Sequence, residues 1–244
     1  MRLDLFLSTN GYCDSRSKAQ LLIQSNRVSV NGTIITKASF NITDTDKVDV
    51  SESTETEFVG RGGNKLEHTF TEFKYSVEGK TCLDIGASTG GFTQCLLLHG
   101  AKEVYAVDSG TGQLAKKLLD DKRVISIEGF NARNLTTDIL DGKLMDVIVM
   151  DVSFISQKLL YPAIMRVASK GCDVITLIKP QFEVGKQHIG KKGIVKDTKI
   201  KQKVVEEIIT YAKEMGFQYI SHTESPLKGG DGNEEFLLHL KVKE

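Results

Sequence analysis

Charged residues stand where two apolar segments of this sequence stop. Residues 145–150 and Asp173–Ile178 are short runs rich in Val and Ile, typical of buried β-strands, and they are followed by Asp151 and by Lys179-Pro180. Lysine is rarely buried without a partner, and neighbouring parallel strands end at the same edge of a sheet. We therefore expect Asp151 and Lys179 to lie close together, either as an ordinary salt bridge between strand ends or as a catalytic pair.

A glycine-rich turn follows an earlier strand, in the stretch CLDIGASTGGF. It departs from the dinucleotide pattern G-x-G-x-x-G because Ser88 takes the middle glycine position, and it fits the looser D-x-G-x-[GS]-x-G turn of S-adenosylmethionine sites. Asp84 would suit the ammonium group of that cofactor, and Asp108, which ends the next strand, would suit two ribose hydroxyls. The alternative is an ordinary strand-to-helix turn. The two acidic residues together favour a nucleotide-type ligand, and a methyl donor over NAD.

Two further strand ends bear on the ligand and the substrate. In IEGFNAR, Glu128 to Asn131 would lie near the adenine or form a simple polar loop. Asp151 is followed by V-S-F rather than by the P-P-Y-like residues of methyltransferases that act on base amines. Cys172 lies at the wrong end of its strand for the nucleophile of cytosine C5 chemistry, so methylation of a base is disfavoured. The predicted cofactor site comprises Asp84, Gly86, Ser88, Gly90, Gly91, Phe92, Asp108, Asn131 and Asp151.

These strand ends belong to a regular alternation of strands and helices from about residue 60 onward. Seven apolar runs have the pattern of strands, at residues 81–86, 103–108, 124–129, 145–151, 173–179, 217–224 and 235–242. Amphipathic helical patterns occupy residues 92–100, 113–121, 159–169 and 201–216. Such alternation predicts a doubly wound α/β sheet of mostly parallel strands, in which ligands bind beyond the carboxyl ends of the strands.

The first fifty residues have a different pattern. A short helix from Leu3 is expected to end near Asn10, and Ser15 can cap a second helix. The pair Asn31-Gly32 between two β-rich runs is a strong hairpin signal, and residues 47–50 predict another short strand. An acidic stretch without apolar residues follows. The predicted organisation is a domain at 1–50, a linker at 51–59 and a larger domain at 60–244.

The sequence resembles the TlyA family, hemolysin-named proteins that act as ribosomal-RNA 2′-O-methyltransferases. The resemblance covers essentially the whole chain and rests on RGGNKL, LDIGASTGGFT, NAR, DVSFIS, KPQFEVGK and GNEEF. It implies a small N-terminal α+β S4-like RNA-binding domain. It further implies an α/β, Rossmann-like, S-adenosylmethionine-dependent methyltransferase domain of the FtsJ-like (RrmJ-like) kind, with a seven-stranded sheet whose last strand is antiparallel.

FtsJ-like enzymes use a Lys-Asp-Lys-Glu tetrad, which the matching motifs place on Lys65, Asp151, Lys179 and Glu235. Glu234 competes for the last position, but the spacing from Gly232-Asn233 favours Glu235. The resemblance implies that Lys179 removes the proton of a ribose 2′-hydroxyl, with Asp151 orienting Lys179. Glu235 would orient Lys65 or the ribose. A lysine base needs a lowered pKa, which desolvation and a second lysine nearby both favour.

Two residues near the predicted site depart from the family pattern, and a third has two possible placements. Family members often carry a serine where this chain has Gly60, and an aromatic residue where it has Thr111. Contacts at the cofactor edge are therefore expected to differ, whereas the tetrad is unaffected. Phe154 would either line the methyl pocket or pack in the core.

The overall charge balance excludes a uniformly basic nucleic-acid binder, because 32 Lys and Arg offset 32 Asp and Glu. Local basic patches remain, in the N-terminal unit and between Lys186 and Lys203, where seven lysines accompany one aspartate. Either patch could be a solvated surface or a phosphate-binding face; the S4 resemblance favours contact with ribosomal RNA and ribosomal subunits. The candidate RNA-binding residues are Arg2, Arg16, Lys18, Arg27, Arg61, Lys186, Lys191 and Lys192.

Other patterns argue against metal, disulfide and membrane functions. The four cysteines form no C-x-x-C pair and the five histidines show no metal-ligand spacing. The apolar run near residue 1 is too short for the pattern of a signal peptide, and no apolar stretch is long enough to span a bilayer. We therefore expect a cytoplasmic protein without bound metal.

The leading hypothesis is an S-adenosylmethionine-dependent 2′-O-methyltransferase acting on cytidine ribose in the RNA of the small or large ribosomal subunit. A second hypothesis is a ribosome-assembly factor that binds RNA without catalysis, which an intact tetrad disfavours. A third is a membrane-lysing hemolysin. For that activity the sequence offers neither a spanning segment nor a basic amphipathic helix with aromatic anchors.

Overall fold

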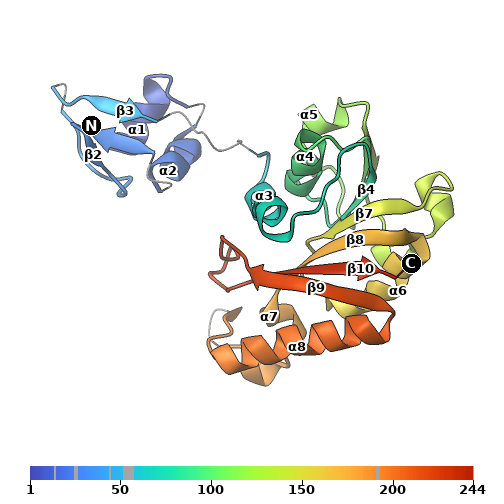
Figure 1. Ribbon diagram of the computed structural model, residues 1–244. Coiled ribbons are helices and arrows are strands. Elements are labelled where there is room, and N and C mark those ends of the chain that lie inside the picture. Colours follow the sequence, from blue (N-terminus) through green and yellow to red (C-terminus); the bar gives the residue numbers. More distant parts are fainter. Residues whose placement is uncertain (14, 25–26, 44, 52–57, 191–192, 244) are drawn as a thin grey trace. The chain divides into compact units, whose positions relative to one another are not determined.

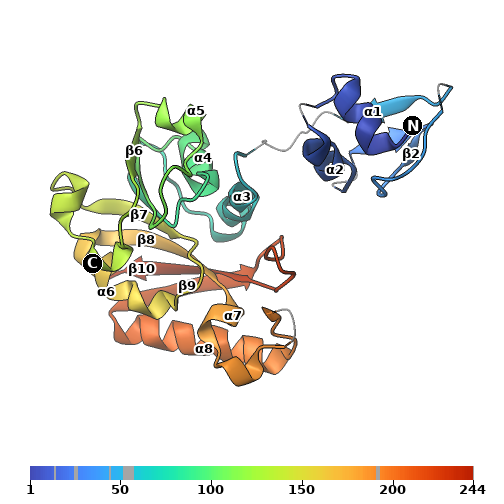
Figure 2. The same cartoon turned by 180° about the vertical axis from the view of Figure 1, so that it is seen from behind.

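The structure is a computed structural model, and it describes residues 1–13, 15–24, 27–43, 45–51, 58–190 and 193–243. The chain divides into two compact units, Met1–Glu57 and Phe58–Glu244, both drawn in Figures 1 and 2. Phe58 and Val59, which the sequence pattern places in the linker, pack against the core of the larger unit.

The smaller unit packs two helices against a three-stranded antiparallel sheet. Its elements are α1 (Leu3–Thr9), α2 (Arg16–Gln24), β1 (Val28–Val30), β2 (Thr33–Ile34) and β3 (Val48–Val50), with the strands in the order β2-β1-β3. Asn31 and Gly32 have φ angles of 51° and 80°, the left-handed values of the predicted hairpin turn. The Ser15 hydroxyl accepts a 3.2 Å hydrogen bond from the Lys18 backbone N–H. The predicted hairpin and helix cap are thus confirmed.

The larger unit is built on a seven-stranded sheet in the order β6-β5-β4-β7-β8-β10-β9. Its strands are β4 (Thr81–Ile85), β5 (Glu103–Val107), β6 (Val124–Ile127), β7 (Met145–Met150), β8 (Ala168–Ile178), β9 (Phe217–Glu224) and β10 (Phe236–Val242). Strands β4 to β8 are parallel, and β10 runs antiparallel to both β8 and β9. The predicted sheet with an antiparallel last strand is confirmed.

Helices cover both faces of this sheet, as Figures 1 and 2 show. On one face, α3 (Gly62–Phe73), α4 (Gly91–Leu98) and α5 (Lys116–Leu119) share a core with Cys82, Val104 and Val149. On the other face, α6 (Tyr161–Val167) and α8 (Thr198–Glu214) share a core with Leu83, Tyr105 and Ile148. Strand neighbours therefore alternate between the two cores, the period of two expected for a sheet buried on both sides. The short helices are α7 (Pro180–Glu183), η1 (Ala132–Asn134), η2 (Thr137–Leu140), η3 (Gln157–Leu159) and η4 (Lys186–His188).

Some elements differ in extent from the sequence expectation. The pattern does not predict α3, because the glycines at its start are poor helix formers; the buried side chains of Leu66 and Thr69 hold it to the core. Helix α5 is shorter than its pattern, since the Glu128 carboxylate accepts hydrogen bonds from the backbone of residues 112–114 and keeps them in a turn. Strand β8 begins at Ala168 rather than Asp173.

Candidate active site

Asp151 and Lys179 meet at the carboxyl ends of two neighbouring strands. Strands β7 and β8 pair in parallel with Met150 opposite Thr176, so the residues that follow them emerge at one edge. Lys179 Nζ lies 2.5 Å from Asp151 Oδ1 and donates a 2.9 Å hydrogen bond to Ser153 Oγ. The predicted proximity of Asp151 and Lys179 is confirmed. Ser153 is an additional partner that the sequence pattern does not single out.

A second lysine–carboxylate pair emerges at the same edge. Because β10 is antiparallel to β8, its first residue, Phe236, lies opposite Ile178, and the preceding Glu235 is brought next to the carboxyl end of β8. Lys65 Nζ of α3 donates a 2.6 Å hydrogen bond to Glu235 Oε2, and both side chains are buried. Taking two charges out of water is costly unless their geometry is good, so the pair is held in one arrangement.

The adjacent Glu234 has a different partner. Its carboxylate forms an ion pair with Lys201 of α8 and lies 3.7 Å from Lys228 Nζ, and the side chain is 41% exposed. Glu234 and Glu235 thus point to opposite sides of the chain, so only Glu235 reaches Lys65. This geometry agrees with the assignment that spacing favours.

Close backbone contacts hold the glycine-rich turn against Asp151. A Cβ atom at Gly86 would lie 2.3 Å from the Asp151 carbonyl oxygen, and Gly86 has a φ of 85°, so only glycine fits there. A Cβ at Gly62, the first residue of α3, would lie 3.8 Å from Asp151 Oδ2. At Gly60, where the family often has serine, a Cβ would lie 2.4 Å from Thr89 Oγ1, a side-chain atom that can rotate away.

Two cavities adjoin these residues. The larger, about 510 Å³, is lined by the predicted cofactor residues Gly86, Ser88, Asp108, Asn131 and Asp151, and also by Phe130, Val152, Ser153 and Phe154. The smaller, about 210 Å³, is lined by Gly60, Arg61, Gly62, Gly86, Ser88, Gly91, Phe92 and Asp151, among others. Asp151 borders both cavities, and the larger has the volume of an ordinary small-molecule site.

Asp84 and Gly90, both within the described ranges, line neither of these cavities. Asp84 is fully buried and accepts a 2.7 Å hydrogen bond from the Thr93 hydroxyl. Burial raises the pKa of Asp84 to about 7; the Thr93 hydrogen bond opposes this shift and the nearby Asp151 charge adds to it. Its Oδ1 atom has no hydrogen-bond partner among the described residues. Asp84 therefore lies beneath the turn rather than in the cavity wall.

The acidic residues that follow β5 and β6 shape the far side of the larger cavity. Asp108 accepts 2.7 Å hydrogen bonds from the backbone N–H groups of Ser88 and Gly110, one on each oxygen. Because a carboxylate has about four acceptor positions, two remain for a ligand diol. Glu128 instead uses its carboxylate to hold the backbone of residues 112–114, which lowers its pKa. Of the segment expected near the adenine, Phe130 and Asn131 line the cavity.

Phe154 is the most unusual side chain at this edge. It lines the larger cavity, yet it is 90% exposed, which excludes the core-packing alternative. Its φ of 64° is rare for an aromatic residue, and its ring centroid lies 5.0 Å from that of Phe182 in α7. Sequence reasoning cannot detect this exposure, because an aromatic residue after a strand normally packs inward.

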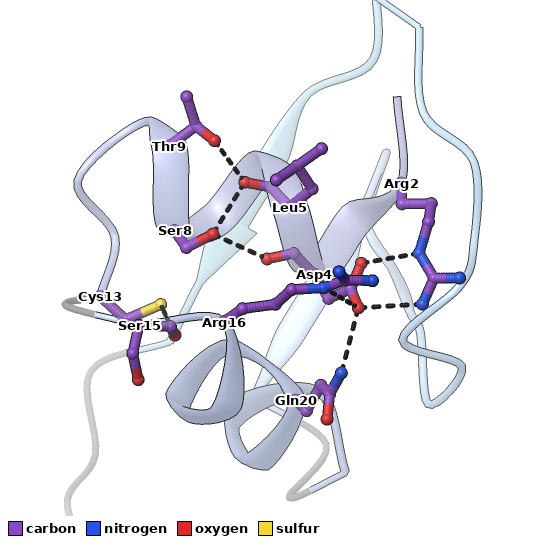
Figure 3. Close-up of polar contacts among 9 residues, drawn as sticks. All are labelled: Arg2, Asp4, Leu5, Ser8, Thr9, Cys13, Ser15, Arg16 and Gln20. Carbon is purple, nitrogen blue, oxygen red and sulfur yellow. Dashed lines mark hydrogen bonds and ion pairs between the residues drawn. The ribbon is translucent and has the colours of Figure 1, made fainter.

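In the smaller unit, two of the three candidate RNA-binding arginines converge on one buried carboxylate (Figure 3). Arg2 binds Asp4 through Nε and Nη2 at 3.0 and 2.9 Å, Arg16 through Nε at 3.0 Å, and Gln20 through its amide at 3.2 Å. The Arg2 hydrogen bonds, together with those of Gln20 and Arg16, hold the pKa of Asp4 well below its usual range despite burial. Asp4 thus fixes two half-exposed guanidinium groups on one side of the unit.

The other candidate RNA-binding residues have varied placements. Arg27 donates to the Ser51 carbonyl oxygen at 3.0 Å, and Arg61, in the larger unit, donates to the Lys228 carbonyl oxygen at 3.1 Å. The Lys18 backbone takes part in the helix cap described above. Lys186 begins η4, while Lys191 and Lys192 lie outside the described residues.

The sheet order, the glycine-rich turn after β4 and the acidic residue after β5 define a Rossmann-like methyltransferase domain. Residues 58–242 match the FtsJ-like methyltransferase family, and residues 1–48 match the S4 domain family. The chain therefore belongs to the FtsJ-like methyltransferases and carries an N-terminal S4 domain.

Comparison with similar proteins identifies the family within the FtsJ-like methyltransferases. "Hemolysin A" of Brachyspira hyodysenteriae is 46% identical over 242 residues, which cover 99% of this chain and 100% of the relative. The "16S/23S rRNA (cytidine-2′-O)-methyltransferase TlyA" of Mycobacterium tuberculosis is 40% identical, covering 99% and 90%. The solved structure of a hemolysin-named protein from Streptococcus thermophilus matches with a TM-score of 0.78 at 39% identity, covering 100% of this chain and 89% of that one. The resemblance to the TlyA family is confirmed.

Within the described ranges, no helix combines the length and the apolar character needed to cross a bilayer.

Proposed function

We propose that this protein transfers the methyl group of S-adenosylmethionine to the 2′-hydroxyl of a cytidine ribose in ribosomal RNA. The observation that carries the proposal is the Asp151–Lys179 pair at the carboxyl edge of the sheet, in which Asp151 lines a cavity of ligand size and holds Lys179 Nζ beside it. The substrate class is supported by the activity that the name of the TlyA relative from Mycobacterium tuberculosis states.

The larger cavity suits S-adenosylmethionine on chemical grounds. The two remaining acceptor positions of Asp108 match the hydroxyls of a ribose, and Phe130 and Val152 offer apolar surface. Gly86 lacks a side chain and so lets the turn pack against the Asp151 backbone at the wall of this cavity. When bound, the cofactor supplies an electrophilic methyl group.

Lys179 is placed to take the proton of the attacking hydroxyl. Lys179 Nζ would accept the proton of the ribose 2′-hydroxyl as that oxygen takes the methyl group that the cofactor would supply. Asp151 and Ser153 fix the position of that nitrogen, at 2.5 and 2.9 Å.

The buried Lys65–Glu235 pair is assigned a positioning role. Its two charges are shielded from water and joined by a 2.6 Å hydrogen bond, so they need little reorganisation during the reaction. The pair ties the start of α3 to the start of β10 and thereby holds the wall of the site next to Asp151.

The exposed Phe154 ring is assigned to the nucleobase of the substrate. It follows Ser153, the hydrogen-bond partner of Lys179, so a nucleotide whose ribose reaches Lys179 would bring its base near this ring. Stacking of a base on an aromatic side chain contributes about 1–3 kcal/mol and tolerates different sequences. The S4 domain would supply further contacts with phosphates.

The proposal is tested by incubating the full-length protein with labelled S-adenosylmethionine and isolated, unmethylated small and large ribosomal subunits. The expected product is a labelled cytidine whose methyl group is on the ribose 2′-oxygen, identified by nucleoside analysis. Label on a base would refute the assigned chemistry. RNA binding without label on either subunit would instead support the ribosome-assembly hypothesis.

A further inference from the structure

Three metal-ligating side chains gather on the outer side of the α3–α4 helix pair, outside the proposed active site. Glu67 comes from α3, and Cys95 and His99 come from α4 and the residue that ends it. Cys95 and His99 are one helical turn apart and so share a face. Glu67 Oε2 lies 2.8 Å from His99 Nε2 and 3.4 Å from Cys95 Sγ, and all three ligand atoms lie within 4.8 Å of one another.

We propose that Glu67, Cys95 and His99 bind a borderline divalent transition-metal ion, with zinc as the best match. Zinc accepts thiolate sulfur, imidazole nitrogen and carboxylate oxygen at about 2.0–2.3 Å in tetrahedral sites, which spaces the ligand atoms about 3.3–3.6 Å apart. The two short distances in this cluster are within about half an ångström of that range. Small side-chain rotations would therefore admit the ion.

The exposure of the cluster provides an entry path and a fourth ligand. The Glu67 and His99 side chains are 45% and 32% exposed, whereas Cys95 is buried behind them. An ion would enter from the solvent side and keep a water molecule there. On binding, the Cys95 thiol would lose its proton to solvent and ligate as a thiolate.

Two observations set this cluster apart from incidental contacts. All four cysteines are buried, and in the described part of the chain the Sγ atoms of Cys13, Cys82 and Cys172 donate to backbone carbonyl oxygens. Cys95 instead faces a carboxylate and an imidazole. In addition, the His99 ring stacks on Phe70 with centroids 3.7 Å apart and planes 9° apart, which fixes the direction of its nitrogen atoms.

A bound ion would join two helices that carry parts of the proposed active site. Glu67 lies two residues after Lys65 in α3, and α4 begins at Gly91 of the glycine-rich turn. The ion would therefore stabilise the contact between the helix that holds Lys65 and the turn that meets the cofactor. This role is independent of the methyl-transfer chemistry and is tested without it.

The test is a titration of the chelator-treated full-length protein with Co²⁺, which reports a thiolate ligand by sulfur-to-cobalt charge-transfer absorption. We expect saturable binding of one Co²⁺ per chain, displacement by Zn²⁺ and loss of the charge-transfer band in Cys95→Ala. The matched control Cys13→Ala should keep the band. His99→Gln and Glu67→Gln, both at partly exposed positions, should bind at least about tenfold more weakly.

Several results would overturn the site. Co²⁺ affinity unchanged in His99→Gln and Glu67→Gln would reduce the cluster to an ordinary ion pair, and a charge-transfer band that persists in Cys95→Ala would place the ion elsewhere. If Cys95→Ala does not fold, the Co²⁺ affinities of His99→Gln and Glu67→Gln decide the question alone.

Discussion

Strand β8 carries a charged cluster of similar burial near each end, and of the two only the cluster at the carboxyl end has residues that line the cavities described above. At its carboxyl end, Lys179 contacts Asp151 and Ser153. Nearer its amino end, where Asp173 pairs with Val147 at the start of the parallel core, the Asp173 carboxylate lies 2.9 Å from His239 Nε2 and 3.5 Å from Lys80 Nζ. The Lys179 and Asp173 side chains are 12% and 10% exposed, so burial does not distinguish them.

The surroundings of the two clusters explain their different roles. Burial opposes ionisation of Asp173, but the His239 hydrogen bond and the charge of Lys241 hold its pKa below the ordinary value. The rings of Phe73 and Tyr75 pack against His239, and Asp173 lines neither of the two cavities at the active-site edge. We therefore assign the amino-end cluster a structural role, whereas Asp151 and Ser153 of the Lys179 cluster line the larger cavity.

The largest expected effect is on the rate of methyl transfer when Lys179, at the carboxyl end of β8, is replaced. Lys179→Ala should lower the single-turnover rate of methyl transfer to unmethylated ribosomal subunits by about 10²–10⁴-fold, the usual contribution of a general base. Lys179→Arg should be equally impaired, because arginine keeps the charge but cannot accept the proton at neutral pH. Near-normal activity of Lys179→Arg would show that a fixed positive charge suffices and that the base lies elsewhere.

A second test separates the adjacent glutamates. Glu235→Gln leaves the buried Lys65 without its carboxylate, which should lower the free energy of unfolding by about 3–5 kcal/mol. Glu234→Gln should cost less, because its carboxylate is 41% exposed. Measured per folded molecule, methyl transfer should fall only in Glu235→Gln. Equal loss of activity in both variants would contradict the assignment of Glu235.

The buried Asp84 predicts a pH dependence of stability. Its pKa of about 7 in the folded protein lies above the unfolded value of about 3.9, so folding favours the protonated form. The resulting stabilisation is complete below about pH 4 and is lost as the pH rises to about 7, on the order of 4 kcal/mol. The unfolding free energy of Asp84→Asn minus that of the wild type should rise across this window in chemical denaturation. A constant difference would show that Asp84 does not titrate there.

Substitution in the amino-end cluster around Asp173 should change stability and leave activity unchanged, in contrast to Lys179. Asp173→Asn weakens contacts to His239, Lys80 and Lys241, so the free energy of unfolding should fall by about 1–3 kcal/mol. The rate of methyl transfer per folded molecule should match that of the wild type. A specific loss of activity in this variant would break the distinction between the two clusters.

The smallest effect concerns Phe154. Both Phe154→Ala and Phe154→Gly remove the ring and should raise the KM for ribosomal subunits. The backbone φ at this position is 64°, which strains alanine but not glycine. The free energy of unfolding of Phe154→Gly should therefore exceed that of Phe154→Ala by about 1 kcal/mol. Equal stability of the two variants would argue against strain at this position.

Much of the fold and the centre of the site are predictable from sequence because strand ends are local signals. Apolar runs that stop at Asp151 and Lys179 predict two strand ends. The parallel pairing of β7 with β8 then brings these two residues together at one edge of the sheet. The pairing of Lys65 with Glu235 is not local, since 170 residues separate them; only the family resemblance groups them. Tertiary packing determines three features that have no periodic pattern in the sequence. These are the arginine contacts of Asp4, the exposure of Phe154 and the proximity of Glu67 to Cys95.

The most direct measurement compares single-turnover methyl transfer by the wild type, Lys179→Ala and Asp173→Asn on the same unmethylated subunits, normalised to folded protein. We predict that Asp173→Asn reacts at the wild-type rate and that Lys179→Ala is at least about 10²-fold slower, with cofactor binding retained in both. Comparable rates for Lys179→Ala and the wild type would contradict the assignment of catalysis to the carboxyl edge of β8.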